Sequence, residues 1–222
     1  MLKYKLFCLF ALLMLFPMVS AFGQDDLNTN ESPYPDYQED VFMDMELSQN
    51  ILTPKVANDL KKRISSYQRK KADEISERYV VDMTRDDEVF ILCIPTDDIF
   101  LPNDTLLSKY APQVLTPVLS LMKGDPYMYK IVVAIHTDDT GSDNYLQNLS
   151  TARINSIYDW MLDAMDSKLI SWDLVVIPYP MAATDPLVDN DTIEKRQQNR
   201  RLEFYFIPGP KMIDLAKSNK LR

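Results

Sequence analysis

The sequence has little of what common catalytic sites are made from. Its 222 residues include four glycines, two cysteines and one histidine. With His136 as the sole histidine, a histidine-rich zinc site is excluded and a Ser-His-Asp triad is disfavoured. The glycines are isolated from one another, so the chain has no Gly-rich loop that could cradle a phosphate. These absences argue against an enzyme and favour a recognition role, without cofactor or metal.

The remaining reactive residues give catalysis little support. Asp138 and Asp139 are adjacent, so alternating side-chain directions point them apart rather than pairing them as general acid and base. Cys93 lies in the middle of an apolar run, which is typical of an inert core thiol. A hydrolase therefore stays a remote third hypothesis.

The N-terminus has the pattern of an export signal. Lys3 and Lys5 precede an apolar stretch at 6–18, and the small residues Ala21 and Gly23 offer a cleavage site. We expect a signal peptide over 1–23 and no transmembrane span after its cleavage; an uncleaved anchor is the alternative. Without the two lysines, 22 basic and 33 acidic residues give a formal charge of −11 instead of −9, which disfavours nucleic acid as a partner.

Two segments precede the main domain. Residues 24–54 carry eight acidic residues and no basic ones, which predicts a disordered or loosely docked acidic linker; residues 41–43 are a candidate partner-binding spot within it. Residues 55–87 are expected to form an amphipathic helix, capped by Thr53 and running to Tyr79, followed by a connector. The basic face of this helix is typical of a solvated surface, and residues 24–79 could also contact other envelope proteins.

From residue 88 onward, strand and helix patterns alternate. Strands are expected at 88–95, 130–136, 173–178 and 202–207. Helices are expected at 108–121 and 144–165, with a helix or ordered loop at 189–200. The order predicts an α+β domain over 88–210, with a four-stranded sheet and helices packed on one side, followed by a tail at 211–222.

The most informative stretch joins the second strand to the long helix. Asp138 closes the strand, a turn follows at Gly141, and Arg153 lies on the flank of the helix's apolar stripe. A fixed anion and a fixed cation on neighbouring elements can hold a zwitterion. A structural salt bridge between the two is the alternative, and both can be states of one site.

The motifs around this stretch resemble those of OmpA-like peptidoglycan-binding domains. The resemblance rests on His136-Thr137-Asp138, Gly141-Ser142, Tyr145, Leu149-Ser150 and Arg153, and on the run Asn199-Arg200-Arg201-Leu202-Glu203 before the last strand. It covers about residues 88–208 and implies a βαβαβαβ domain with a mixed sheet. It also implies binding of the diaminopimelate residue of the peptidoglycan stem peptide, in the periplasm, associated with the cell wall or outer membrane.

The resemblance also implies residue roles. Asp138 would take the ligand's ammonium and Arg153 a carboxylate, with Thr137, Asn103 and Gly141 contributing to the site. The supporting residues would be Asn199, Arg200 and Arg201.

Two departures from the family pattern bear on binding. Leu146 replaces an asparagine, and the segment 178–183 replaces a glycine-rich turn, which would reshape the rim of the site. The first hypothesis is a non-catalytic cell-wall-binding module. The second is an envelope or secretion scaffold whose OmpA-like fold has lost ligand binding.

Overall fold

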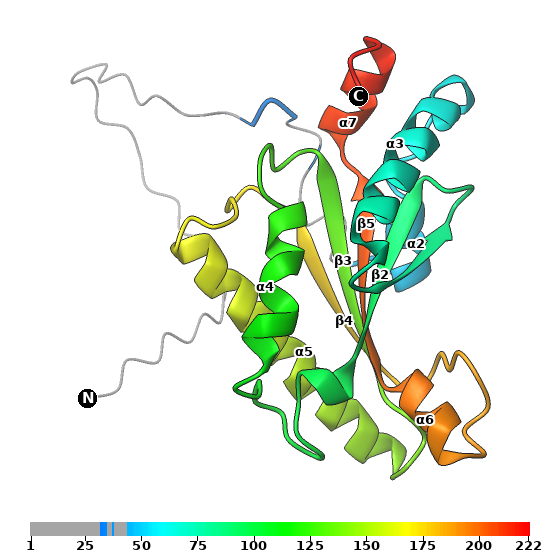
Figure 1. The fold of residues 1–222 in the computed structure, drawn as a ribbon, viewed down its shortest axis with the longest axis vertical. Helices are drawn as coiled ribbons and strands as arrows, with labels where there is room; N and C mark the ends of the chain where they lie inside the picture. Colours follow the sequence, from blue (N-terminus) through cyan, green and yellow to red (C-terminus); the bar gives the residue numbers. More distant parts are fainter. Residues whose placement is uncertain (1–31, 35–36, 38–43) are drawn as a thin grey trace, which may run out of the picture. The chain divides into compact units, whose positions relative to one another are not determined.

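The computed structural model describes residues 32–34, 37 and 44–222. The predicted signal peptide and residues 41–43 lie outside these residues. The main body, Tyr34–Arg222, is built on one mixed five-stranded sheet with the order β1-β2-β5-β3-β4 (Figure 1). Its strands are β1 (Val80–Thr84), β2 (Val89–Pro95), β3 (Tyr129–His136), β4 (Val176–Ala182) and β5 (Arg201–Pro208). The β3–β4 pair is parallel and the other three pairs are antiparallel.

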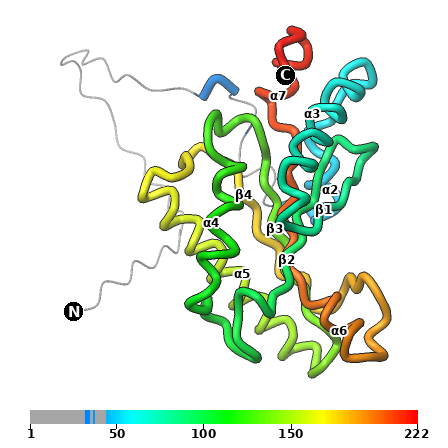
Figure 2. The backbone as a smooth tube through the Cα atoms, in the orientation of Figure 1, coloured from blue at the N-terminus to red at the C-terminus, as the bar shows by residue number. Residues whose placement is uncertain are grey.

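The sheet has one strand more than the sequence analysis predicts. Residues 80–84, expected as a connector, form edge strand β1, which pairs with β2 (Figure 2). The hairpin turn places Arg85, Asp86 and Asp87 at positive φ, which non-glycine residues rarely adopt. Helix α3 (Asn58–Ser76) forms ion pairs with this turn: Arg69 pairs with Asp87, and Lys61 lies 3.6 Å from Asp86. Long-range contacts of this kind are not visible in local sequence patterns.

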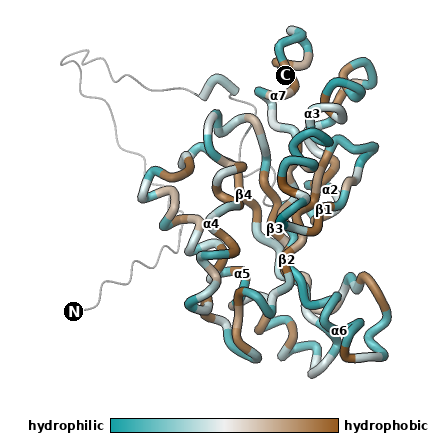
Figure 3. The backbone as a smooth tube through the Cα atoms, in the orientation of Figure 1, coloured by the Kyte–Doolittle hydropathy of each residue, from teal (hydrophilic) through white to brown (hydrophobic). Residues whose placement is uncertain are grey.

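One face of the sheet is covered by helices that share the larger apolar core. These are α3 (Asn58–Ser76), α4 (Ala111–Leu121), α5 (Asp143–Asp166) and α7 (Pro210–Lys217). The strands contribute alternate residues, for example Ile131, Val133 and Ile135 of β3, because successive side chains point to opposite faces. The apolar colouring concentrates on these strands and on the helix faces around them (Figure 3). Two short elements, η1 (Thr96–Asp98) and α6 (Ile193–Asn199), complete the domain.

The other face is also covered, which differs from the prediction of helices on one side only. Helix α2 (Leu47–Leu52) brings Met45, Leu47 and Ile51 against the second apolar cluster, which includes Val132 and Ala134 of β3. Of the two expectations for the linker over 24–54, disordered or loosely docked, residues 44–54 follow the second, because α2 docks on the sheet. The apolar residues near the end of the linker provide enough hydrophobic surface to dock this segment.

Polar contacts with α2 add to this docking. Lys130 of β3 is fully buried; its Nζ donates to the Asn50 backbone oxygen and to Thr53 Oγ1 (2.6 Å). Burial lowers the pKa of Lys130 to about 7. Because Thr53 is engaged here, it does not cap α3, which begins at Asn58 rather than at Pro54. Among the described residues, none of the helices has the length and apolar character needed to cross a membrane.

Candidate functional site

The turn between β3 and α5 places the predicted site residues. The backbone N–H of Thr137 donates to the Ala182 carbonyl (2.8 Å), and Ser142 caps α5 by accepting from the Tyr145 N–H (3.3 Å). Between them Gly141 has a φ of 142°. A Cβ at this glycine would lie 2.8 Å from Tyr145 Cδ1, so the turn requires glycine for both its backbone and its space.

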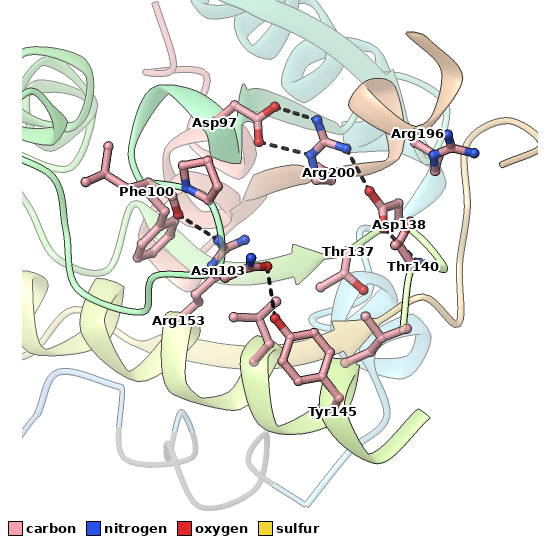
Figure 4. Close-up of a pocket in the computed structure, with 14 residues that line it drawn as sticks. Asp97, Phe100, Asn103, Thr137, Asp138, Thr140, Tyr145, Arg153, Arg196 and Arg200 are labelled. Carbon is pink, nitrogen blue, oxygen red and sulfur yellow. Dashed lines mark hydrogen bonds and ion pairs between the residues drawn. The ribbon is translucent and has the colours of Figure 1, made fainter. Parts of the chain in front are cut away.

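A pocket of about 510 Å³ opens beside this turn. It is formed by β3's end, α5, α6's end and the loop after η1, and Figure 4 shows its side chains. Five of the eight predicted residues line it: Asn103, Thr137, Asp138, Arg153 and Arg200. The other lining residues are Asp97, Phe100, Leu101, Pro102, Thr140, Tyr145, Leu146, Leu149 and Arg196.

Asp138 lies at the pocket wall with 8% of its surface exposed. Its Oδ1 accepts from the Thr140 N–H (2.9 Å), and its Oδ2 accepts from Arg200 Nη1 (2.7 Å). Burial alone would raise the pKa of Asp138, but the hydrogen bonds from Arg200 and Thr140 outweigh it and hold the pKa below its usual value. The carboxylate is therefore ionised at neutral pH and able to receive a cation.

Arg200 lies between two carboxylates. Besides Asp138, it contacts Asp97 through two hydrogen bonds, Nε to Oδ1 (3.0 Å) and Nη2 to Oδ2 (2.6 Å). These contacts raise the pKa of Arg200, and the hydrogen bonds to Asp97 contribute most. The sequence analysis missed Asp97, although its place directly after a predicted strand was a usable signal. The ion-pair partner of Asp138 is thus Arg200, and the expected Asp138–Arg153 bridge does not occur among the described residues.

Arg153 is anchored by the loop that follows η1. Its Nε donates to the Asp104 carbonyl (2.8 Å) and its Nη2 to the Leu101 carbonyl (3.3 Å). The guanidinium also lies over the Phe100 ring, 4.8 Å from the centroid. Burial lowers the pKa of Arg153, which nevertheless stays cationic. No contact among the described residues uses Nη1, so one edge of the guanidinium remains available to a carboxylate in the pocket.

Asn103 and Tyr145 meet across the pocket. Asn103 has a φ of 60°, and its Oδ1 accepts a hydrogen bond from the Tyr145 hydroxyl (3.0 Å; Figure 4). Tyr145 keeps 41% of its surface exposed. The Thr137 hydroxyl is buried, and no partner for it occurs in the described part of the chain. The loop after η1 and the start of α5 are thus linked directly at the pocket.

The remaining predicted residues do not line the pocket. Arg201 Nε donates to Glu203 Oε1 (2.6 Å), and Glu203 Oε2 also contacts His136 Nε2 (3.1 Å). Asn199 accepts from the backbone N–H groups of Leu187 and Val188 and so holds the loop before α6. Gly141 acts through the turn, as described above.

One departure from the family pattern, at residues 178–183, does not lie at the rim of the pocket. The segment 178–183 was predicted to reshape the rim, but residues 176–182 form strand β4, and none of them lines the pocket. Pro178 and Pro180 are tolerated because β4 is an edge strand. Leu146 does line the pocket and is 4% exposed, so it gives the wall an apolar surface.

The described residues offer no alternative catalytic constellation. No group of three or more His, Cys, Asp or Glu side chains in this part of the chain could hold a metal ion. His136 is held in the buried contact with Glu203. Burial raises the pKa of Cys93 to about 12, which makes it a poor nucleophile.

Comparison with known sequences identifies one family. The OmpA family model matches residues 99–200, inside the predicted domain 88–210. No curated protein sequence matches the chain.

Several solved structures are similar to this chain. A protein described as MotB-like, from Desulfovibrio vulgaris, is 24% identical over 67% of this chain and 96% of its own, with a TM-score of 0.56. The cell wall anchor of the T6SS from Pseudomonas aeruginosa (18% identity, 67% and 99% coverage) has a TM-score of 0.47. The periplasmic domain of Helicobacter pylori MotB is 20% identical over 64% of this chain and 88% of its own, and also has a TM-score of 0.47. The first of these supports the α+β OmpA-like fold.

Proposed function

We propose that this chain, in which residues 99–200 form an OmpA-family domain, binds the diaminopimelate residue of peptidoglycan between Asp138 and Arg153. OmpA-like domains are non-catalytic binding domains of the peptidoglycan-binding kind. Such a role places the protein in the periplasm, in association with the cell wall. The predicted export signal agrees with this location.

The proposal rests on one pocket that holds an anionic and a cationic side chain. Each of them has hydrogen-bonding capacity left for a zwitterionic ligand. The side chain of diaminopimelate ends in an ammonium and a carboxylate on one carbon. Asp138 and Arg153 lie on different sides of the pocket (Figure 4). The Asp138 carboxylate suits the ammonium, and the free edge of Arg153 suits the carboxylate. A charged hydrogen bond contributes about 1.5–3 kcal/mol, so two of them agree with a micromolar to millimolar affinity.

The contacts of Arg200 allow Asp138 to bind a ligand while the pocket keeps its arrangement. Its two hydrogen bonds to Asp97 hold the guanidinium in place independently of Asp138. When an ammonium approaches, Asp138 can share its oxygens between Arg200 and the ligand. Asp97 is therefore proposed as a positioning residue for Arg200.

Co-sedimentation with purified sacculi tests the proposal. We expect Asp138→Ala and Arg153→Ala each to lower the bound fraction about tenfold, which corresponds to the loss of one charged contact of about 1.4 kcal/mol. Asp139→Ala is the matched control, because Asp139 is the neighbouring carboxylate, is exposed and does not line the pocket. Equal binding by wild type and all three variants would contradict the proposal. Thermal unfolding of each variant separates lost binding from lost folding.

The scaffold alternative makes the opposite prediction. It requires a protein partner that co-purifies with the chain while sacculi bind neither wild type nor variants. Part of the surface it would use is already occupied, because Leu47 and Ile51 pack on the chain's own sheet and Ile64 is fully buried. Because these residues are already buried within the chain, they favour the peptidoglycan-binding proposal over the scaffold alternative.

A further inference from the structure

A second charged hollow lies between α3 and the end of the chain, away from the pocket. This basic groove has a volume of about 380 Å³. Its lining residues are Lys62, Arg63, Ser66, Tyr67, Lys70, Asn219, Leu221 and Arg222. They include four basic side chains and no acidic one, in a chain whose formal charge is −9.

The basic residues of α3 divide into two sets. Three have carboxylate partners: Lys61 lies 3.7 Å from Glu88, Arg69 pairs with Asp87, and Lys71 lies 2.7 Å from Glu74.

The other three, Lys62, Arg63 and Lys70, have no carboxylate within 4.0 Å among the described residues, and all three line the basic groove. Helical geometry explains their convergence: Arg63 and Lys70 are seven positions apart and share a face, and Lys62 lies on its flank, eight positions before Lys70.

The groove is built to donate hydrogen bonds. Arg63 is fixed by a hydrogen bond from Nη1 to the Ala216 carbonyl (2.8 Å), which leaves its other N–H groups to the groove. The Asn219 amide adds a neutral donor beside the ammonium groups, whereas the Ser66 hydroxyl donates to the Lys62 carbonyl (2.8 Å). Leu221 gives one apolar contact surface.

The groove and the pocket lie at opposite ends of the sheet. Helix α7 follows the end of β5, where Pro208 pairs with Tyr129 at the start of β3. The pocket lies beyond the other end of the same strand pair, where Ile135 pairs with Leu202. Figure 1 shows α7 and the start of α3 at one end and α6 at the other. A ligand in the groove and a ligand in the pocket would not compete.

We propose that the basic groove binds a phosphate-bearing anion. Clustered lysine and arginine side chains with an amide donor match the several acceptor oxygens of a phosphate group. Four cations exceed what one carboxylate can balance, and the volume admits a group larger than inorganic phosphate. The same chemistry is found on anionic lipid headgroups and on soluble phosphorylated compounds. With a lipid as the source, the domain would join the cell wall at one end to a membrane surface at the other.

The experiment compares two double variants of α3 that change the net charge equally. Lys62→Gln/Lys70→Gln removes unpaired cations of the groove, and Arg69→Gln/Lys71→Gln removes two paired cations of the same helix. The purified chain is co-sedimented with phosphatidylglycerol or phosphatidylcholine vesicles and titrated with inorganic pyrophosphate, at low and high salt. Phosphatidylcholine vesicles report binding by the apolar N-terminal residues, which all variants share.

We expect the first double variant to lose about tenfold in binding and the second to lose less than twofold, with binding weakened by salt. Binding to phosphatidylglycerol vesicles identifies a lipid source, and binding to pyrophosphate alone identifies a soluble one. Absence of binding to both probes overturns the proposal, as does an equal loss in the two double variants. Sacculus binding through Asp138 is measured separately, so either proposal can fail alone.

Discussion

Arg200 and Arg201 follow each other in the chain, yet their side chains enter two different charge clusters. Arg200 joins Asp97 and Asp138 in the open cluster, beside the pocket. Arg201 joins His136, Glu203 and Tyr205 in the closed cluster, in which Tyr205 donates to Glu203 Oε2 (2.6 Å). The division follows from the backbone, since neighbouring residues at the start of β5 point in different directions.

Exposure separates the two clusters. Side chains of the open cluster are 50% (Asp97), 24% (Arg200) and 11% (Asp138) exposed. In the closed cluster Glu203 is 6% and Arg201 5% exposed. Solvent and ligand can exchange with partners in the first cluster, whereas a lost partner in the second leaves a buried charge. We therefore propose that the open cluster serves binding and expect the closed cluster to serve stability.

Glu203→Gln gives the largest expected effect. It leaves Arg201 buried without its carboxylate, so we expect the free energy of unfolding to fall by about 3 kcal/mol. Burial alone would raise the pKa of Glu203, but contacts with His136, Tyr205 and Arg201 lower it to about 2. Because the pKa is depressed in the folded state, this stabilisation is present above pH ~4.5 and is lost as the pH falls towards 2. Urea titrations at several pH values should show this slope in wild type and a reduced slope in the variant.

Asp138→Asn should affect binding and spare the fold. We expect affinity for a diaminopimelate peptide to fall by tenfold or more, about 1.5–3 kcal/mol, with the free energy of unfolding changed by less than about 1 kcal/mol. Calorimetric titration and urea unfolding of the same sample check both numbers. A variant that loses stability as Glu203→Gln does, while keeping its affinity, would reverse the assignment of the two clusters.

Gly141→Ala tests whether the turn matters only to the open cluster. The positive φ and the clash with Tyr145 should cost about 1–2 kcal/mol of stability and displace Tyr145 from Asn103. Affinity should fall by a few-fold, with the chemical shifts of the closed cluster unchanged by NMR. Gly124→Ala is a useful control, because Gly124 also has positive φ (109°) but nothing lies within 4 Å of its Cβ position.

Arg200→Gln should have the smallest effect on affinity and a clear effect on titration. Without Arg200, Asp138 loses the side-chain hydrogen bond and the positive charge that help to lower its pKa, so we expect the pKa of Asp138 to rise. Binding in the variant should therefore weaken at a higher pH than in wild type as the solution is acidified. NMR titration of the Asp138 carboxyl carbon measures this directly. An unchanged pKa would mean that the open cluster does not control the ionisation of Asp138.

The sequence predicts the frame of the domain because its signals are local. Apolar runs and helical periodicity locate β2, β3, β5 and the long helix α5 within two residues, whereas β4 begins three residues later and ends four residues later than expected. The turn motif and the run at 199–203 predict four of the fourteen residues that line the pocket: Thr137, Asp138, Arg153 and Arg200. What local patterns miss is pairing over distance. Strand β1 pairs with β2, and its hairpin turn forms ion pairs with α3, whereas α2 packs on β3 and contacts Lys130, about 80 positions away.

The same limit applies inside the site. Sequence motifs bring Asp138 and Arg153 to one pocket, but they do not show that Arg200 is the partner of Asp138 or that Arg153 is anchored by the Leu101 and Asp104 carbonyls. Asp97 was missed because its role depends on the geometry of Arg200. Competition among several nearby charges is settled by three-dimensional packing, which residue spacing alone does not determine.

The proposed function requires that Arg153 receives the carboxylate that distinguishes diaminopimelate from lysine. The most direct measurement is calorimetric titration of wild type and Arg153→Ala with two stem peptides, identical except for diaminopimelate or lysine at the third position. We predict that wild type binds the diaminopimelate peptide about tenfold more tightly, and that Arg153→Ala binds both peptides with the same weak affinity. A preference that is absent in wild type, or that persists unchanged in Arg153→Ala, would contradict the account.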